Sequence, residues 1–302
     1  MSGLPRRAWL RGVVGGAVAL AQAPAGAALP RSPHRVASQR LRLGLALGSG
    51  SASGFAHIGV LKSLVQAGIK PDFVAGSSAG ALVGALYAAG YSPFRIEDVA
   101  LHVRDVEVAD FASAGKRGML LGDSLHRLVG DAVRGATIET LPIGYAAVTT
   151  DLRSGERVVL SAGSVADAVR ASCSIPGVFV PREIGGRELV DGGLVSPLPV
   201  STARALGGEF VIAVDVGTKP YRTSMPGLYE VLLQSFEIMG HALSQQEAAQ
   251  ADLVIRPDTS AWASSDFSVR REMIQAGYEA AQRALPELKR RLDAGSARSR
   301  PT

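Results

Sequence analysis

The sequence contains a single cysteine, Cys173, among its 302 residues. One thiol excludes an internal disulfide framework and a zinc site built from cysteines, and a small buried residue is the simpler interpretation. The five histidines also lack the H-E-x-x-H spacing or any similar ligand pattern. We therefore expect neither a metal nor another cofactor.

Charge of one sign does not dominate the chain. Charged residues make up 20% of the sequence and hydrophobic residues 47%, which is typical of a globular protein. The formal net charge is +5, and much of the basic excess lies in residues 31–42 and 289–300. Nucleic-acid binding needs basic residues gathered on one face, so no nucleic-acid partner is expected. The basic ends could contact anionic lipid head groups, although solvated tails are the simpler interpretation.

The first 27 residues have the pattern of an export signal. Arg6-Arg7 begins a charged run, a weakly apolar stretch follows from Gly12, and Ala25-Gly26-Ala27 offers a small-x-small cleavage site. The paired arginines are similar to the bacterial twin-arginine type. A membrane anchor needs ~20 strongly apolar residues, which this Gly- and Ala-rich stretch lacks. We expect an exported, periplasmic or secreted protein; a disordered arginine-bearing arm is the alternative.

Short apolar runs alternate with helical patterns along residues 42–288. This alternation predicts an α/β fold with a largely parallel sheet and helices on both faces. Residues 91–140 are expected to be helical, with breaks at Pro93 and at residues 115–118. We expect residues 28–41 to form a flexible linker and 289–302 a basic tail. The expected strands are 41–47, 73–75, 145–149, 157–160, 188–190, 210–216 and 253–255, and the other expected helices are 55–67, 81–89, 165–171, 200–206, 228–249 and 269–288.

One pentapeptide has the G-x-S-x-G spacing of a nucleophile elbow: Gly76-Ser77-Ser78-Ala79-Gly80. It lies between a short apolar run and an Ala- and Leu-rich helical pattern, the strand–turn–helix context that this motif requires. Only glycine leaves room on either side of so tight a turn, which exposes the Ser78 hydroxyl. The following helix directs its free N–H groups toward the same point. Ser78 is therefore a candidate nucleophile, with a glycine-rich turn and a capping serine as the alternative.

Two further motifs favour acyl-transfer chemistry. The loop Gly48-Ser49-Gly50-Ser51-Ala52-Ser53-Gly54 consists of small residues whose backbone N–H groups can form an anion-binding nest. Beside a serine nucleophile, such a nest can hold the oxyanion of a tetrahedral intermediate. Asp191-Gly192-Gly193 follows an expected strand and could place a carboxylate within reach of the serine as a general base.

In this order, the three motifs resemble those of the patatin-like phospholipases, and most closely the short bacterial members. The resemblance spans roughly residues 42–288, about one domain. It implies a three-layer α/β/α sandwich, a lipid or phospholipid ester substrate and an acyl-serine intermediate. It also implies a Ser–Asp dyad of Ser78 and Asp191. Implied oxyanion-hole residues are Gly48, Ser49, Gly50 and Ser51; implied supporting glycines are Gly54, Gly76, Gly80, Gly192 and Gly193; further matching segments are 57–61, 150–152, 171–176 and 197–200.

Two positions depart from the family pattern. Ser53 stands where the family loop usually carries Arg or Lys, and Ser196 stands where Asn often follows the Asp-Gly-Gly turn. We expect Ser196 to keep one hydrogen bond to that turn. The Ser53 replacement motivates an alternative, a catalytically impaired member that binds lipid or protein.

Other interpretations have less support from the sequence. The loop after the first strand has some likeness to a dinucleotide fingerprint, but its third glycine is one place late and Asp72 precedes its strand. His241 is the one histidine after Asp191, and it falls in an expected helix, whereas His57 is expected to orient the glycine loop. Residues 101–135 form a candidate lid, whose Met119-Leu120-Leu121 could contact a membrane surface transiently; buried core is the simpler interpretation.

Overall fold

The structure is a computed structural model that describes residues 41–103, 110, 112, 117–217 and 227–298. The expected export signal and nearly all of the expected linker lie outside these residues, so both stay predictions. Within the described residues, no helix is both long enough and apolar enough to cross a membrane.

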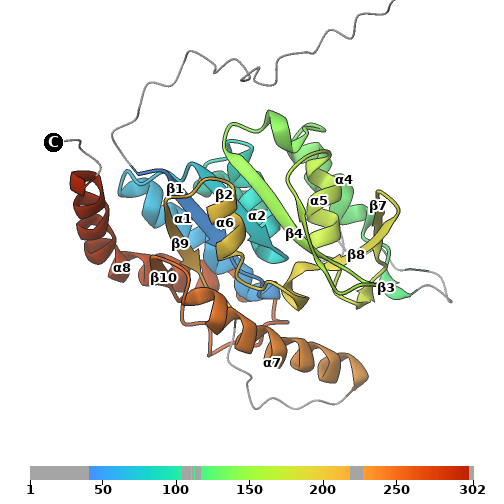
Figure 1. Ribbon diagram of the computed structural model, residues 1–302. Coiled ribbons are helices and arrows are strands. Elements are labelled where there is room, and N and C mark those ends of the chain that lie inside the picture. Colours follow the sequence, from blue (N-terminus) through green and yellow to red (C-terminus); the bar gives the residue numbers. More distant parts are fainter. Residues whose placement is uncertain (1–40, 104–109, 111, 113–116, 218–226, 299–302) are drawn as a thin grey trace, which may run out of the picture. The chain divides into compact units, whose positions relative to one another are not determined.

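A central sheet of eight strands organises the chain (Figure 1). Its order is β10-β9-β1-β2-β4-β8-β7, and β5 pairs with β4. The neighbours from β10 to β4 are parallel, whereas β8, β7 and β5 join in antiparallel pairs. The strands are β1 (Leu43–Leu47), β2 (Phe73–Ser77), β4 (Gly144–Asp151), β5 (Arg157–Leu160), β7 (Arg182–Ile184), β8 (Arg187–Asp191), β9 (Phe210–Val214) and β10 (Leu253–Ile255).

Helices cover both faces of the sheet, as the sequence predicts. Leu43, Leu45 and Leu47 of β1 alternate toward the larger core, where α1, α2 and α8 pack. Ala46 points to a smaller core shared with α6 and the end of α7. Small side chains on that face let α6 lie close to the sheet. The helices are α1 (Ala56–Gln66), α2 (Ala79–Ala88), α3 (Pro93–His102), α4 (Asp123–Ala132), α5 (Val165–Ser172), α6 (Val200–Ala205), α7 (Leu228–Ala248) and α8 (Arg270–Arg298), with short 3₁₀ turns η1 (Ser51–Phe55), η3 (Ile138–Thr140) and η4 (Gly192–Leu194).

Strand register brings the predicted motifs to one edge of the sheet. Leu47 at the end of β1 pairs with Gly76 of β2 and with Val214 of β9. The loops that follow these parallel strands therefore start side by side at their carboxyl ends. Asp191 ends β8 and pairs with Thr149 of β4, beside the end of β2. Backbone pairing in the sheet is thus sufficient to bring the three motifs close together.

The expected fold class is confirmed, but several short elements were not anticipated. β3 (Gly118–Leu120) lies in a region expected to be helical and pairs in parallel with β6 (Gly177–Phe179) as a separate two-stranded sheet. Three-residue strands are too short to show a periodic pattern. Within the expected lid, Leu120 is half-buried while Met119 is 49% exposed. Residues 104–109, 111 and 113–116 of that expected lid lie outside the described residues.

The last helix also continues farther than expected. α8 passes Pro286 and ends at Arg298, whereas the sequence pattern predicts an end near Leu288. Leu288 is fully buried, and Glu287 pairs with both Arg290 and Arg291 on the next turn. Such i,i+3 and i,i+4 ion pairs support a helical continuation through a polar sequence.

Candidate active site

Ser78 occupies a strained turn between β2 and α2. Its φ of 52° and ψ of −122° place a non-glycine residue in a left-handed region that costs roughly 1–3 kcal/mol. A Cβ at Gly76 would lie 2.4 Å from the Gly80 carbonyl oxygen, and a Cβ at Gly80 would lie 2.2 Å from that of Leu47. The backbone therefore approaches itself so closely that both flanking positions require glycine, as the elbow interpretation predicts.

The Ser78 hydroxyl donates a hydrogen bond to Asp191. The distance from Ser78 Oγ to Asp191 Oδ2 is 2.6 Å, across 113 residues of sequence. The other carboxylate oxygen accepts the Gly193 N–H at 2.8 Å, which fixes the carboxylate plane. Both side chains belong to residues that are only 6% exposed. The fold thus joins the two residues that the family resemblance implies as nucleophile and base.

Burial changes the acidity of this carboxyl group. Removal from water raises the pKa of Asp191 to about 6, while the hydrogen bonds from Ser78 and Gly193 act in the opposite direction. A general base works best with a pKa near the working pH. Asp191 is therefore a stronger base than an ordinary aspartate and is still ionised at neutral pH.

The end of α5 and the turn that follows it bond the backbones of both Ser78 and Asp191. Ser172 Oγ accepts the Ser78 N–H at 2.9 Å and donates to the Val148 carbonyl at 2.6 Å. Cys173 Sγ donates to the Ser78 carbonyl at 3.3 Å, and the Ser174 carbonyl accepts the Asp191 N–H at 2.9 Å. We call residues 172–174 the brace. The sequence marks this segment only as part of the resemblance, because contacts to residues 78 and 191 need the fold.

The four residues implied as the oxyanion hole differ in whether their N–H groups are already bonded within the described part of the chain. Gly48 N–H donates to the Val214 carbonyl at 3.0 Å, and Ser49 N–H donates to the Pro197 carbonyl at 2.8 Å. Among the described residues, neither the Gly50 nor the Ser51 N–H has an acceptor. Gly50 and Ser51 line the same cavity as Ser78. Of the four implied oxyanion donors, Gly50 and Ser51 are therefore the two that remain free to bind one.

The two histidines near the site do not contact the reactive pair. His57 is fully buried, and its Nε2 lies 2.8 Å from the Gly48 carbonyl oxygen, so the ring donates from Nε2. Burial lowers the pKa of His57 to about 4 and keeps it neutral. His57 holds the glycine loop, as expected. His241 lies on α7 and bonds Gln245 at 2.9 Å.

A cavity of about 100 Å³ opens beside Ser78. Gly50, Ser51 and Asp191 line it on the sheet side, and α7 lines it with Phe236 and His241. Within the described residues, no three His, Cys, Asp or Glu side chains gather as a metal-binding group.

Ser53 and Ser196, the two departures from the family pattern, are both buried, and their hydroxyl groups differ in whether they are hydrogen-bonded. Ser53 is fully buried, and no described residue bonds its hydroxyl. Ser196 N–H donates to the Gly192 carbonyl at 2.9 Å, so the turn is bonded through the backbone. The expectation for its side chain was wrong, because the Ser196 hydroxyl donates to Glu247 of α7. That bond ties α7 to the segment behind the turn.

The fold and the serine elbow define the class, an α/β protein with a serine at a tight strand–helix turn, and comparisons with known proteins define the family. A family model described as patatin-like phospholipase matches residues 45–204. The chain belongs to the patatin-like phospholipase family. An uncharacterised NTE family protein of Mycobacterium tuberculosis is 37% identical over 218 residues, covering 70% of this chain and 59% of that protein.

Two other proteins are similar over different extents. The patatin-like phospholipase domain-containing protein 7 of Rattus norvegicus is 34% identical over 187 residues, which are 59% of this chain and 14% of that protein. The crystal structure of VipD from Legionella pneumophila aligns with a TM-score of 0.56 at 15% identity, covering 83% of this chain and 67% of VipD. This likeness supports the fold. The chain spans less than two thirds of the curated relatives named here.

Proposed function

We propose that the protein is a serine lipid acyl hydrolase that cleaves a carboxylic ester of a lipid or phospholipid, of the phospholipase A or lysophospholipase type. The observation that carries the proposal is the 2.6 Å hydrogen bond from Ser78 Oγ to the buried Asp191 carboxylate. Family membership supports a lipid as the substrate class. A Ser–Asp dyad performs the chemistry without a histidine.

The reaction proceeds through an acyl-serine intermediate. Asp191 accepts the Ser78 proton while Ser78 Oγ attacks the ester carbonyl carbon. The N–H groups of Gly50 and Ser51 stabilise the oxyanion, and Asp191 returns its proton to the alcohol that leaves. A water molecule then attacks the acyl group, Asp191 accepts one proton of that water, and the carboxylic acid departs as Ser78 is reprotonated.

The enzyme also contacts a lipid surface transiently, by the outer face of α7. Four large apolar side chains of this helix are exposed by 40–53%: Val231, Leu232, Ile238 and Met239. The opposite face of α7 lines the cavity through Phe236 and His241. Because a lipid substrate is held in a membrane or micelle, an exposed apolar face beside the cavity can bind that surface while the substrate enters.

Export of the protein is part of the same proposal. Its support is the sequence pattern of residues 1–27, with the twin arginines Arg6-Arg7 and a small-x-small site. Replacement of both arginines by lysine should retain the protein in the cytoplasm of a bacterial host. Unchanged export of that variant contradicts this part of the proposal.

The alternative is an impaired member that binds lipid or protein without turnover. The observation behind it is Ser53, buried where the family usually carries a cation. Fluorophosphonate labelling of the protein, with the adduct mapped by mass spectrometry, separates the two. Labelling at Ser78 and none in Ser78→Ala supports the hydrolase, whereas no labelling of folded wild type supports the binding protein.

A further inference from the structure

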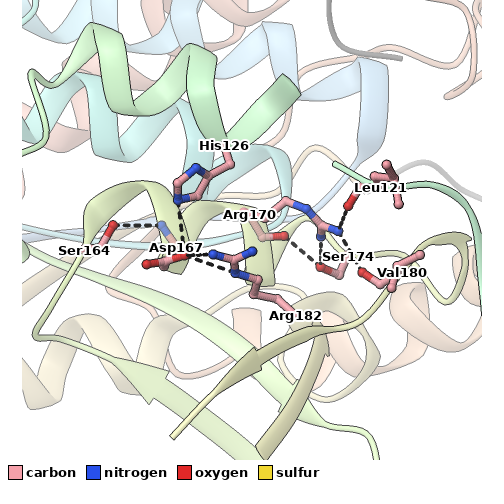
Figure 2. A network of polar contacts seen from close by, with 8 residues as sticks. All are labelled: Leu121, His126, Ser164, Asp167, Arg170, Ser174, Val180 and Arg182. Carbon is pink, nitrogen blue, oxygen red and sulfur yellow. Dashed lines mark hydrogen bonds and ion pairs between the residues drawn. The ribbon is translucent and has the colours of Figure 1, made fainter. Parts of the chain in front are cut away.

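Arg170 is a buried cation that bonds Ser174, the residue whose carbonyl accepts the Asp191 N–H. It lies on α5, is 2% exposed, and points its guanidinium into the interior (Figure 2). The guanidinium donates to three acceptors: Ser174 Oγ, the Leu121 carbonyl, and the Val180 carbonyl at 2.7 Å. No carboxylate is among these acceptors. Burying a charge costs free energy, and these three hydrogen bonds offset part of that cost while fixing the position of the side chain.

The surrounding chain is shaped to admit this side chain. The Phe179 ring lies 5.3 Å from the Arg170 guanidinium carbon. Gly122 adopts a φ of 77°, and a Cβ at that position would lie 1.9 Å from Arg170 Nε. The guanidinium thus joins β3, the end of β6 and the turn after α5 at one point.

Ser174 connects this point to the reactive pair. Its hydroxyl accepts from the guanidinium and donates to the Arg170 carbonyl at 2.7 Å, so the side chain is held from both sides. The Ser174 carbonyl accepts the Asp191 N–H at 2.9 Å. The two preceding residues of the brace, Ser172 and Cys173, bond the backbone of Ser78. A single short turn therefore contacts both Ser78 and Asp191.

We propose that Arg170 is a positioning residue, which fixes the brace through Ser174 and thereby sets the distance between Ser78 Oγ and Asp191 Oδ2. The inference rests on the proposed hydrolase function. Arg170 touches neither reacting atom and acts only through the turn. A misplacement of about 1 Å can cost on the order of 100-fold in rate, so a loosened brace has a measurable effect.

A neighbouring arginine provides a matched control. Arg182 pairs with Asp167 of α5, and Asp167 also lies 3.2 Å from His126 Nε2 (Figure 2). Arg182 is one-third exposed and bonds no residue of the brace in the described part of the chain. Its removal takes away an arginine from the same network without touching the turn.

The first test compares Arg170→Lys, Arg170→Met and Arg182→Met with wild type. The readouts are kcat and KM for a short soluble ester, corrected for the fraction of Ser78 that a fluorophosphonate labels. Arg170→Met should lower kcat by at least 10-fold with KM within twofold, Arg170→Lys should restore part of the loss, and Arg182→Met should stay within twofold of wild type. Equal kcat in folded Arg170→Met and wild type overturns the inference.

The second test is a double-mutant cycle with Ser174→Ala. If Arg170 acts through Ser174, the double variant should be no slower than the slower single variant. Rate losses that multiply overturn the inference.

Where Arg170 variants do not fold, Ser174→Ala alone tests the proposal: a slower kcat supports it and a wild-type kcat refutes it. Unlabelled, folded wild type would instead overturn the proposed hydrolase function itself.

Discussion

The side chain of Ser172 holds the backbone of Ser78, with the Ser172 hydroxyl oxygen 2.9 Å from the nucleophile's amide nitrogen. The same hydroxyl donates to the Val148 carbonyl at 2.6 Å, so its orientation is fixed. Ser78 sits at a φ of 52°, a conformation that persists only where surrounding contacts enforce it. Ser172 is one of those contacts.

Replacement of Ser172 by alanine should therefore loosen the elbow. Ser172→Ala leaves a buried N–H and a buried carbonyl unpaired, at a cost of about 1–3 kcal/mol in the free energy of unfolding. Ester turnover per folded molecule should fall as well. Ser154→Ala, at an exposed position, is the control. Urea unfolding and soluble-ester kinetics check both effects, and wild-type values for Ser172→Ala would contradict the account.

The elbow glycines allow a sharper stability comparison. Gly80→Ala would place a Cβ 2.2 Å from the Leu47 carbonyl oxygen, so the variant should lose several kcal/mol or fail to fold, as overpacked backbone contacts do. Gly130→Ala, also inside a helix, would place its Cβ 3.7 Å from Ala166 Cβ and should gain roughly 0.5–1 kcal/mol. Thermal unfolding of the pair measures this; similar melting temperatures would refute the close approach at Gly80.

The pKa of Asp191 predicts a pH-dependent stability. Burial raises that pKa from 3.8 to about 6, so the folded state binds the proton more tightly than the unfolded state does. The contribution of this group to stability is complete below pH 3.8 and is lost as pH rises through about 6. Relative to Asp191→Asn, wild type should lose about 2 kcal/mol between pH 4 and pH 7. Urea unfolding measures this change. A difference in unfolding free energy between wild type and Asp191→Asn that stays constant with pH would contradict a raised pKa of Asp191.

His57 titrates in the opposite sense. Burial lowers its pKa from 6.5 to about 4, so its contribution is complete above pH 6.5 and is lost as pH falls toward 4. In His57→Gln the amide can still donate to the Gly48 carbonyl but carries no titrating group. The variant should lose less stability than wild type between pH 7 and pH 4. Parallel losses in the two proteins would argue against a buried neutral histidine.

The apolar face of α7 predicts a difference between soluble and membrane-bound substrates. Met239→Asp places a charge among the exposed apolar side chains of this helix, whereas Gln246→Asp places one two turns farther along the same side, where the sequence is polar. Met239→Asp should weaken binding to phosphatidylcholine vesicles and slow their hydrolysis, while a short soluble ester is cleaved normally. Gln246→Asp should leave both unchanged. Equal vesicle binding by the two variants would contradict the proposal that α7 contacts the membrane.

The sequence predicts the parts of this protein that depend on local spacing. The elbow, the parallel strands and the long helices follow from glycine placement and apolar periodicity, and the structure contains them. The Ser78–Asp191 contact joins residues 113 apart, and only the family resemblance implied it. No local pattern distinguishes the N–H groups of Gly48 and Ser49, which bond neighbouring strands and loops, from those of Gly50 and Ser51. The roles of Ser172 and Arg170 likewise depend on where α5 packs.

The Asp191→Asn variant tests the central claim, a two-residue Ser–Asp dyad, most directly. Its rate of Ser78 labelling by a fluorophosphonate at pH 7.5 should be compared with wild type, and circular dichroism should show that both proteins are folded. Loss of a general base predicts a rate lower by about 10²–10⁴-fold, with the residual adduct still on Ser78. Labelling of folded Asp191→Asn at the wild-type rate would contradict the dyad.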